Sequence, residues 1–109
     1  MNSQPNNALL SALNHCANAC NFCSTACLEE QDVKMMVNCI RLDTDCAAIC
    51  NLTASLIARN SVHGKHLLKE CAEICGLCAA ECEKHKKMQH CADCAAACRT
   101  CEQACRAAA

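Results

Sequence analysis

The sequence predicts an all-α protein: an antiparallel up-down-up-down four-helix bundle with a cysteine-lined core. Sixteen of the 109 residues are cysteine, and nearly all of them lie three or four positions apart within four clusters. Proline occurs once and glycine twice, so few residues would end a helix or form a turn. Between the cysteines the chain is rich in alanine, leucine, glutamate, lysine and glutamine, which favour helix.

The cysteine spacing defines one face of each helix. Alternating steps of three and four residues average roughly 3.5, the period of a helix that packs along one seam. The thiols therefore form a narrow stripe on one side of each helix. The clusters are Cys16, Cys20, Cys23 and Cys27; Cys39, Cys46 and Cys50; Cys71, Cys75, Cys78 and Cys82; and Cys91, Cys94, Cys98, Cys101 and Cys105.

Each helix has a start or a link that the sequence marks. Pro5 suits the first turn of the first helix, and Asp32 is a suitable N-cap for the second. A connection containing Gly64 precedes the third, and a lysine-rich link precedes the fourth. Short links favour antiparallel neighbours. The predicted helices cover about residues 5–30, 32–60, 64–85 and 87–107 of a single domain, residues 1–109.

The composition limits the kinds of partner and the cellular compartment that we expect. The formal net charge is −1 and no long run of lysine or arginine occurs, so we expect no binding to nucleic acid or to a membrane surface. The first residues lack the cationic region of a secretory signal, and no apolar stretch is long enough to span a bilayer. We therefore expect a cytoplasmic protein whose thiols stay reduced.

The apolar residues are unusually small. They make up 53% of the chain, but 20 of them are alanine, 16 are cysteine and Phe22 is the sole aromatic residue. Such side chains bury little area each, so we expect hydrophobic burial to stabilise the core only weakly. We expect something else to fill or bind the middle.

The two ends of the predicted bundle differ in chemistry. At the end with both termini, the stripes continue into leucine, isoleucine and threonine. We expect these side chains to close the core there, and we call this the plugged end. At the opposite end, here called the mouth, methionine and histidine continue the stripes. Met35 and Met36 are adjacent, and the phase of the stripe favours Met36 as the inward one. Each mouth residue is also compatible with an ordinary core or link position. The candidates are Met36, His85, Met88 and His90.

Asp43 occupies a position that the spacing would give to a cysteine. Taken with Cys39, Cys46 and Cys50, it reproduces steps of four, three and four. An inward carboxylate is costly unless it is paired, hydrogen-bonded or bound to a metal. Alternatively, Asp43 lies at the edge of the stripe and pairs with a neighbouring arginine or lysine.

Disulfides, zinc and iron–sulfur clusters are alternative uses of the thiols. Cysteines three or four apart on one helix make poor disulfides, although bridges between helices remain open. Structural zinc needs four ligands closed tetrahedrally, whereas stripes on rigid helices are expected to present ligands along a line. An iron–sulfur cluster needs one compact group of cysteines, and these thiols extend over roughly 16 Å.

Copper(I) fits the pattern better than these alternatives. It is soft, prefers thiolate and thioether, and is well suited to two or three sulfur ligands. Cysteines at positions i and i+4 lie about 6 Å apart at Cα, so their sulfurs can converge on one ion. Stacked pairs would hold many ions and cross-link the helices from inside. Thioether and neutral imidazole bind Cu(I) more loosely, which suits an access route at the mouth.

Several segments resemble the cytosolic branch of the bacterial copper storage proteins. They are residues 15–27, the Cys-Ile-Arg-Leu-Asp segment 39–43, residues 46–50 and residues 91–105, and the resemblance covers about 12–107. It implies a four-helix bundle that stores many Cu(I) ions in its core, usually as a homotetramer. It also implies that all sixteen cysteines are ligands and that Asp43 and His90 join the coordination.

We therefore expect a non-enzymatic function: high-capacity storage and detoxification of Cu(I) in the cytoplasm, with a copper chaperone as a candidate donor. The alternative is a thiol redox buffer or a disulfide-bridged helical module without a dedicated metal. An enzyme has little support, because the cysteines are alike and none stands out beside a base. The expected ligands are the sixteen cysteines, with Asp43, His90, His85, Met36 and Met88 as weaker candidates for binding or access.

Overall fold

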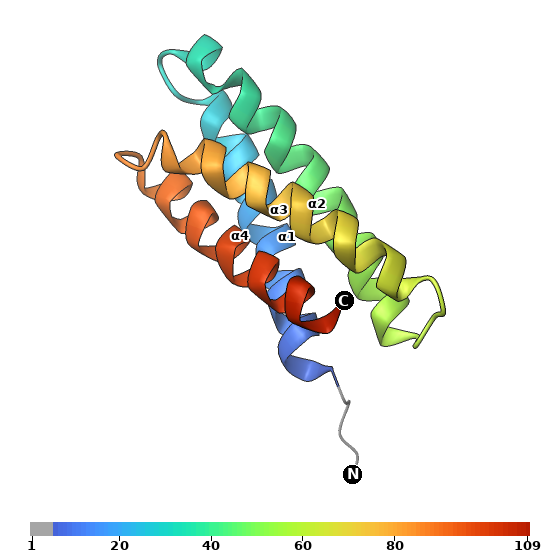
Figure 1. Ribbon diagram of the computed structural model, residues 1–109. Helices are drawn as coiled ribbons and strands as arrows, with labels where there is room; N and C mark the ends of the chain where they lie inside the picture. Colours follow the sequence, from blue (N-terminus) through green and yellow to red (C-terminus); the bar gives the residue numbers. More distant parts are fainter. Residues whose placement is uncertain (1–5) are drawn as a thin grey trace.

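The computed structural model describes residues 6–109, and within them it confirms the predicted four-helix bundle (Figure 1). Pro5 lies outside the described residues. Between residues 6 and 109, no helix combines the length and hydrophobicity that a bilayer crossing requires. The elements in chain order are α1 (Asn7–Leu28), the 3-10 helix η1 (Val33–Met36), α2 (Val37–Ala58), α3 (Gly64–Glu83) and α4 (Gln89–Ala108).

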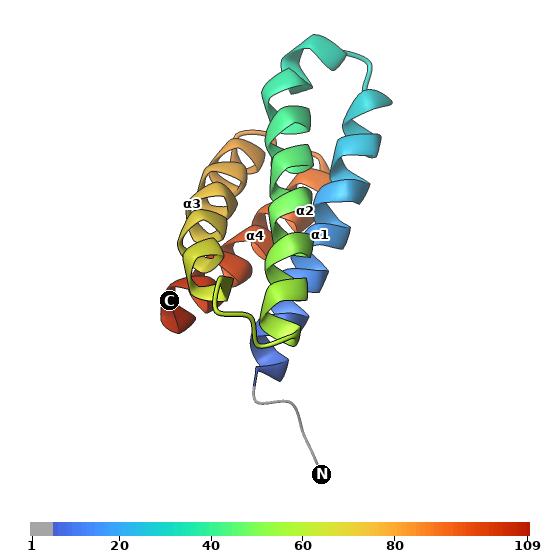
Figure 2. The ribbon, with the colours of Figure 1, turned by 90° about the vertical axis from the view of Figure 1, so that its right-hand side faces the viewer.

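The helices form a closed ring around one core. α1 packs against α2 and α4, and α3 packs against the same two helices. The α1–α2 and α3–α4 links lie together at one end of the bundle (Figure 1). The α2–α3 link, the start of α1 and the end of α4 lie at the other, as the turned view also shows (Figure 2). The mouth and the plugged end are therefore the two ends of one enclosed core.

The second helix begins later than its predicted N-cap. Asp32 precedes η1 and makes no capping hydrogen bond with its side chain. α2 itself begins at Val37, because a tight 3-10 turn, common at helix N-termini, occupies the preceding residues. This turn buries Met36 completely and leaves Met35 59% exposed.

The end of α2 is closed by backbone hydrogen bonds rather than by glycine. Asn60 has a φ of 56°, in the left-handed region that Asn tolerates better than most residues. Its N–H donates to the Ile57 carbonyl at 3.0 Å, and the Ser61 N–H donates to the Leu56 carbonyl at 2.9 Å. This pair of bonds satisfies carbonyls that the helix end leaves free, and it turns the chain toward α3.

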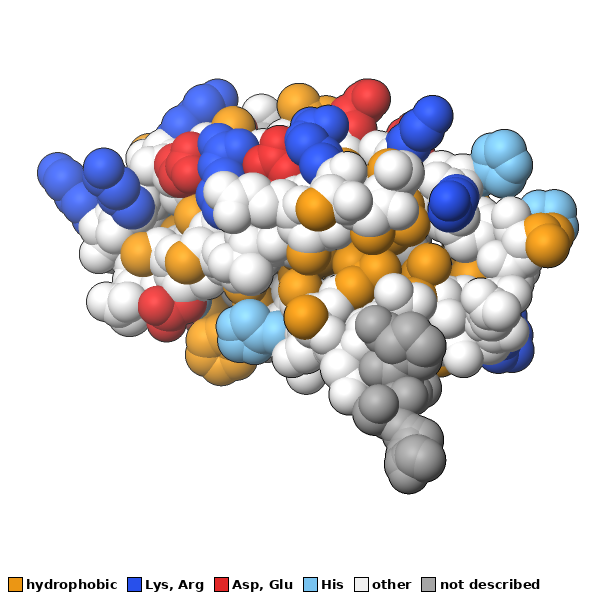
Figure 3. Space-filling view, turned by 60° about the horizontal axis from the view of Figure 1, so that its bottom comes forward, with side chains coloured by type: hydrophobic (Ala, Val, Ile, Leu, Met, Phe, Trp, Pro, Cys, Tyr) orange, Lys and Arg blue, Asp and Glu red, His pale blue; other side chains and the backbone are white. Residues whose placement is uncertain are grey.

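Hydrocarbon closes the core at the end that carries the α2–α3 link. Leu13 and Leu68 are almost fully buried there, beyond the last cysteines of their stripes. Figure 3 looks toward this end and shows hydrophobic side chains gathered in a recess. A pocket of about 450 Å³ lies there, and among the residues that line it are Leu9, Ile57, Val62, Leu68 and Ala108.

Thr53 leaves a buried polar atom unsatisfied at this end. Its side chain is fully buried, and Oγ1 has no hydrogen-bond partner among the described residues. By contrast, the exposed Thr44 donates from Oγ1 to the Ile40 carbonyl at 2.8 Å. Thr53 therefore carries the desolvation cost of its hydroxyl without a compensating bond.

Removing this hydroxyl should stabilise the copper-free protein. We expect Thr53→Val, which keeps the branched shape, to raise the free energy of unfolding by about 1–2 kcal/mol. Urea denaturation of the reduced protein measures the change, and Thr44→Val at the exposed site is the control, with an effect within about 0.5 kcal/mol. A lower stability of Thr53→Val would show that the hydroxyl has a partner in solution.

Candidate metal centre

The thiols of all four helices face one shared interior. Each of the sixteen cysteine side chains is fully buried, and each is a free thiol. Neighbouring sulfurs lie in van der Waals contact, from 3.5 Å between Cys39 and Cys82 to 4.0 Å between Cys101 and Cys105. The bundle therefore encloses sulfur where most bundles of this kind enclose hydrocarbon.

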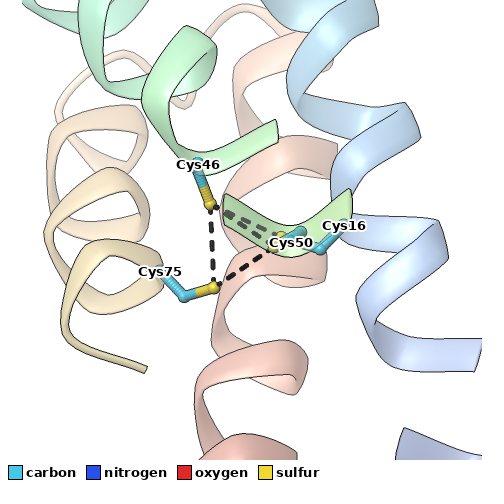
Figure 4. A group of neighbouring side chains, drawn as sticks. All are labelled: Cys16, Cys46, Cys50 and Cys75. Carbon is cyan, nitrogen blue, oxygen red and sulfur yellow. Dashed lines mark hydrogen bonds between the residues drawn. The ribbon is translucent and has the colours of Figure 1, made fainter. Parts of the chain in front are cut away.

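The sulfurs converge in groups of four (Figure 4). In one group, Cys16 comes from α1, Cys46 and Cys50 from α2, and Cys75 from α3. The Cys46 sulfur lies 3.8 Å from that of Cys16, 4.0 Å from that of Cys50 and 3.7 Å from that of Cys75. The Cys50 and Cys75 sulfurs are 3.8 Å apart. A soft metal ion in this group would be reached by sulfurs from three helices at once.

Similar groups occur along the axis, and some thiols belong to two of them. The expectation that helical stripes present their thiols only along a line is wrong. The stripes face one another across a narrow bundle, so the all-thiol groups named here each combine sulfurs from three helices. The further all-thiol groups include Cys16, Cys20, Cys46 and Cys98; Cys20, Cys78, Cys94 and Cys98; and Cys50, Cys71, Cys75 and Cys101.

Asp43 lies inside this core, not at its edge. The side chain is fully buried. Its Oδ1 accepts hydrogen bonds from the thiols of Cys78 at 3.1 Å and Cys94 at 3.4 Å, and its Oδ2 accepts one from Cys39 at 3.7 Å. No arginine or lysine is among its hydrogen-bond partners in residues 6–109, so the alternative of a surface ion pair is wrong. Asp43 links thiols of three helices.

The surroundings of Asp43 favour its neutral form. Burial, followed by repulsion from the charge that Cys94 carries when ionised, raises the pKa of Asp43 from 3.8 to about 8. In the copper-free fold at neutral pH the carboxyl group is therefore mostly protonated. A metal ion bound nearby would reverse this preference by adding positive charge.

This pKa makes the stability of the copper-free protein depend on pH. Between about pH 4 and pH 8, Asp43 binds a proton in the folded state but not in the unfolded state. The free energy of unfolding should therefore fall as pH rises through this window, by up to about 1.4 kcal/mol per pH unit.

Urea denaturation of the reduced, metal-free protein at pH 5, 6 and 7 measures this slope. Asp43→Asn is the matched control, because the amide keeps the shape but does not titrate. We expect the variant to lose the Asp43 contribution to the slope. An unchanged slope in the variant would show that another group is responsible.

Burial also favours the neutral form of two thiols near the mouth, those of Cys27 and Cys91. Burial, together with the nearby Cys39, raises the pKa of Cys91 to about 12. Burial likewise raises the pKa of Cys27. Because the thiolate is the metal ligand, each bound thiol must release its proton to the solvent when an ion arrives.

At the mouth, His90 joins three cysteines. Its Nδ1 lies 3.4 Å from the sulfur of Cys23 and 3.5 Å from that of Cys91. The sulfur of Cys23 is also 3.9 Å from those of Cys27 and Cys91. On its other side, His90 Nε2 lies 2.7 Å from Oε2 of Glu30. His90 is therefore oriented by a carboxylate and presents its second nitrogen to the sulfurs.

The other predicted mouth residues are less closely engaged. His85 Nε2 lies 3.2 Å from Oε2 of Glu81 on α3, and no described cysteine sulfur is a hydrogen-bond partner of the His85 ring. Met36 is fully buried within the core cluster, whereas Met88 is partly buried against it. Of the four candidates, His90 is the one in polar contact with thiols.

Sequence reasoning missed Glu30 and Glu81, the partners of the two mouth histidines. Glu81 precedes His85 by four residues, a spacing that places two side chains on the same helix face. The contact between these two residues could therefore be predicted from the sequence. Glu30 is distant from His90 in the sequence and approaches it because the α1–α2 link and the start of α4 share one end. No sequence pattern marks that contact.

Comparisons with known proteins agree with this geometry. The family model of the copper storage proteins matches residues 2–109. The uncharacterized cysteine-rich protein YhjQ of Bacillus subtilis (strain 168) is 42% identical over 106 residues, which cover 97% of each chain.

Two solved structures superimpose closely on the bundle. The Cu(I)-bound copper storage protein BsCsp3 has a TM-score of 0.88 and 42% identity, covering 93% of this chain and 94% of its own. A cytosolic copper storage protein from Streptomyces lividans, solved with five coppers, has a TM-score of 0.88 and 39% identity, covering 94% and 92%. From its buried sulfur groups and these matches together, the chain belongs to the copper storage protein family.

Proposed function

We propose that this protein stores many Cu(I) ions in its interior. The observation that carries the proposal is the convergence of buried, free thiols from three helices into overlapping groups of four along the axis. Cu(I) is a soft ion that prefers thiolate ligands and accepts low coordination numbers. Thiols that belong to two groups can bridge ions, which allows neighbouring ions to share ligands.

All sixteen cysteines are proposed as ligands, and Asp43 as an oxygen donor between thiols of three helices. Each thiol gives its proton to the solvent as the ion binds, so filling releases roughly one proton per thiolate. The metal–sulfur bonds then join helices that are otherwise held by small side chains. Such a function is non-enzymatic, because the thiols act as ligands of a stored ion.

The proposed setting is the cytoplasm, where the protein would remove excess copper. Two observations support it: the S. lividans relative is a cytosolic copper storage protein, and the core requires reduced thiols. A copper chaperone is the proposed donor, because free Cu(I) does not persist among cellular thiols. Assembly as a homotetramer is also proposed; exposed apolar side chains, including Phe22 at 69% and Leu77 at 54%, offer surfaces for subunit contacts. Native mass spectrometry would count the subunits.

Anaerobic titration of the reduced protein with Cu(I), in competition with a chromophoric chelator, tests the storage proposal. We expect tight binding of roughly one ion per thiol, as soft thiolates prefer Cu(I). Saturation at one or two ions would contradict storage. A thiol count on freshly purified protein tests the redox alternative, which requires most thiols to be blocked.

The mouth residues are proposed to set the rate of filling. Replacing His85, His90, Met36 and Met88 together with alanine should slow Cu(I) uptake but leave the final copper content nearly unchanged, because the sixteen thiols remain. Stopped-flow absorption of the copper–thiolate bands measures the rate. Unaltered kinetics in this variant would show that copper reaches the core by another route.

A further inference from the structure

We propose that the copper-free protein binds one zinc ion at the mouth, held by Cys23, Cys27, Cys91 and His90. These four donors form a compact group whose ligand atoms all lie within 4.8 Å of one another. Three cysteines and one histidine are a ligand set that structural zinc sites use. The proposal does not depend on copper storage, because it concerns a different ion and a mixed sulfur–nitrogen site.

Four of the six donor–donor distances lie close to those of a zinc tetrahedron, and the other two are within 4.8 Å. Bonds of about 2.3 Å to sulfur and about 2.0–2.1 Å to nitrogen place two sulfurs about 3.8 Å apart and a sulfur and a nitrogen about 3.6 Å apart. Cys23 lies 3.9 Å from both Cys27 and Cys91. The Nδ1 of His90 lies 3.4 Å from Cys23 and 3.5 Å from Cys91. The site therefore needs little rearrangement to receive the ion.

Glu30 prepares the histidine for this role. A carboxylate accepts hydrogen bonds, so the 2.7 Å contact with Glu30 Oε2 places the proton of His90 on Nε2. Nδ1 then carries the free lone pair, and it faces the sulfurs. A carboxylate behind a ligating histidine is a common arrangement at zinc sites, where it fixes the ring and raises its basicity.

Charge favours the mouth over the all-thiol groups deeper in the core. Zinc with four thiolates carries a net charge of −2, which would be fully buried in a group such as Cys16, Cys46, Cys50 and Cys75. Zinc with three thiolates and a neutral imidazole carries −1, and the further negative charge of the Glu30 carboxylate is partly exposed to solvent. At the mouth the His90 and Glu30 side chains are 12% and 29% exposed, so solvent reaches the site. Burying uncompensated charge is expensive, and the mouth avoids most of that cost.

The zinc ion would occupy the access route and leave when copper arrives. Zinc binding displaces three thiol protons to the solvent. Cu(I), being softer, would then replace zinc on the same thiolates without electron transfer. Loading should therefore release one zinc ion per chain. Zinc would therefore occupy the ligands at the mouth until copper enters the core.

Cobalt(II) serves as a spectroscopic probe of the site, followed by displacement with zinc. We expect the reduced, metal-free full chain to bind one ion per chain. The absorption should be that of tetrahedral cobalt with sulfur-to-metal charge transfer. His90→Ala should lower zinc affinity at least about 10-fold, and Glu30→Gln should lower it about 10- to 100-fold. His85→Ala, at the other mouth histidine, is the matched control and should bind as the parent does.

Two further variants keep the result decisive. His90→Cys restores four donors, so it should bind zinc and give an all-sulfur cobalt spectrum, which also shows that the variant folds. Cys46→Ala/Cys50→Ala alters only deep groups and should leave zinc binding unchanged. The proposal is overturned if no ion binds, if more than one ion binds per chain, or if His90→Ala leaves the cobalt spectrum unchanged. Loss of binding in the deep variant would overturn it as well.

Discussion

Loading with Cu(I) should raise the melting temperature of the protein by more than about 20 °C. The copper-free core is built from small side chains, so its hydrophobic stabilisation is modest. An ion that binds only the folded state at 100 times its dissociation constant adds about 2.7 kcal/mol, and the core offers several such sites. For a domain of this size, each kcal/mol raises the melting temperature by about 4–8 °C.

Calorimetry of the copper-free and copper-loaded protein under anaerobic, reducing conditions measures the shift. Removing copper with a strong Cu(I) chelator should return the melting temperature to its original value. Magnesium, a hard cation that prefers oxygen ligands, is the control and should have no effect. Equal melting temperatures with and without copper would contradict the view that metal bonds join the helices from inside.

Replacing Cys46 and Cys50 with alanine should remove more bound copper than two thiols account for. The Cys46 sulfur contacts those of Cys16 and Cys75, and the Cys50 sulfur contacts those of Cys71, Cys75 and Cys101. Both cysteines belong to overlapping groups. Without them, the remaining thiols of these groups lose the partners needed to complete a site. The copper content at saturation, measured by atomic absorption, reports the loss.

Cys27 and Cys105 provide the matched control, because they lie at the two ends of the sulfur core. In the described residues, the sulfur of Cys27 contacts that of Cys23, and the sulfur of Cys105 contacts that of Cys101. Replacing this pair with alanine removes the same number of sulfurs, so we expect a smaller loss of copper. Circular dichroism would confirm that both variants keep the bundle. Equal losses would show that the thiols act singly rather than in shared groups.

The sequence predicts the fold class because one signal repeats in every helix. The cysteine spacing fixes which face of each helix is buried, and short links fix the antiparallel order. It also places Asp43 among the thiols, since the residue completes the spacing of Cys39, Cys46 and Cys50. In the same way, the phase of the stripe distinguishes the buried Met36 from the exposed Met35.

The sequence cannot give the contacts that depend on how helices face one another. A stripe shows which thiols are buried but not which three helices supply one group, so the sequence does not predict the compact groups of four sulfurs. The contact between Glu30 and His90 likewise forms only because the folded bundle brings the α1–α2 link close to the start of α4. The 3-10 turn before Val37 replaced the predicted cap at Asp32, because local capping preference is weak against packing of Met36 into the core.

The most direct measurement is a crystal structure of the copper-loaded protein, with anomalous diffraction recorded on both sides of the copper absorption edge. We predict a row of copper positions along the bundle axis, each bound by cysteine sulfurs from the facing stripes. Copper confined to surface sites, or cysteines joined as disulfides around an empty core, would contradict the account.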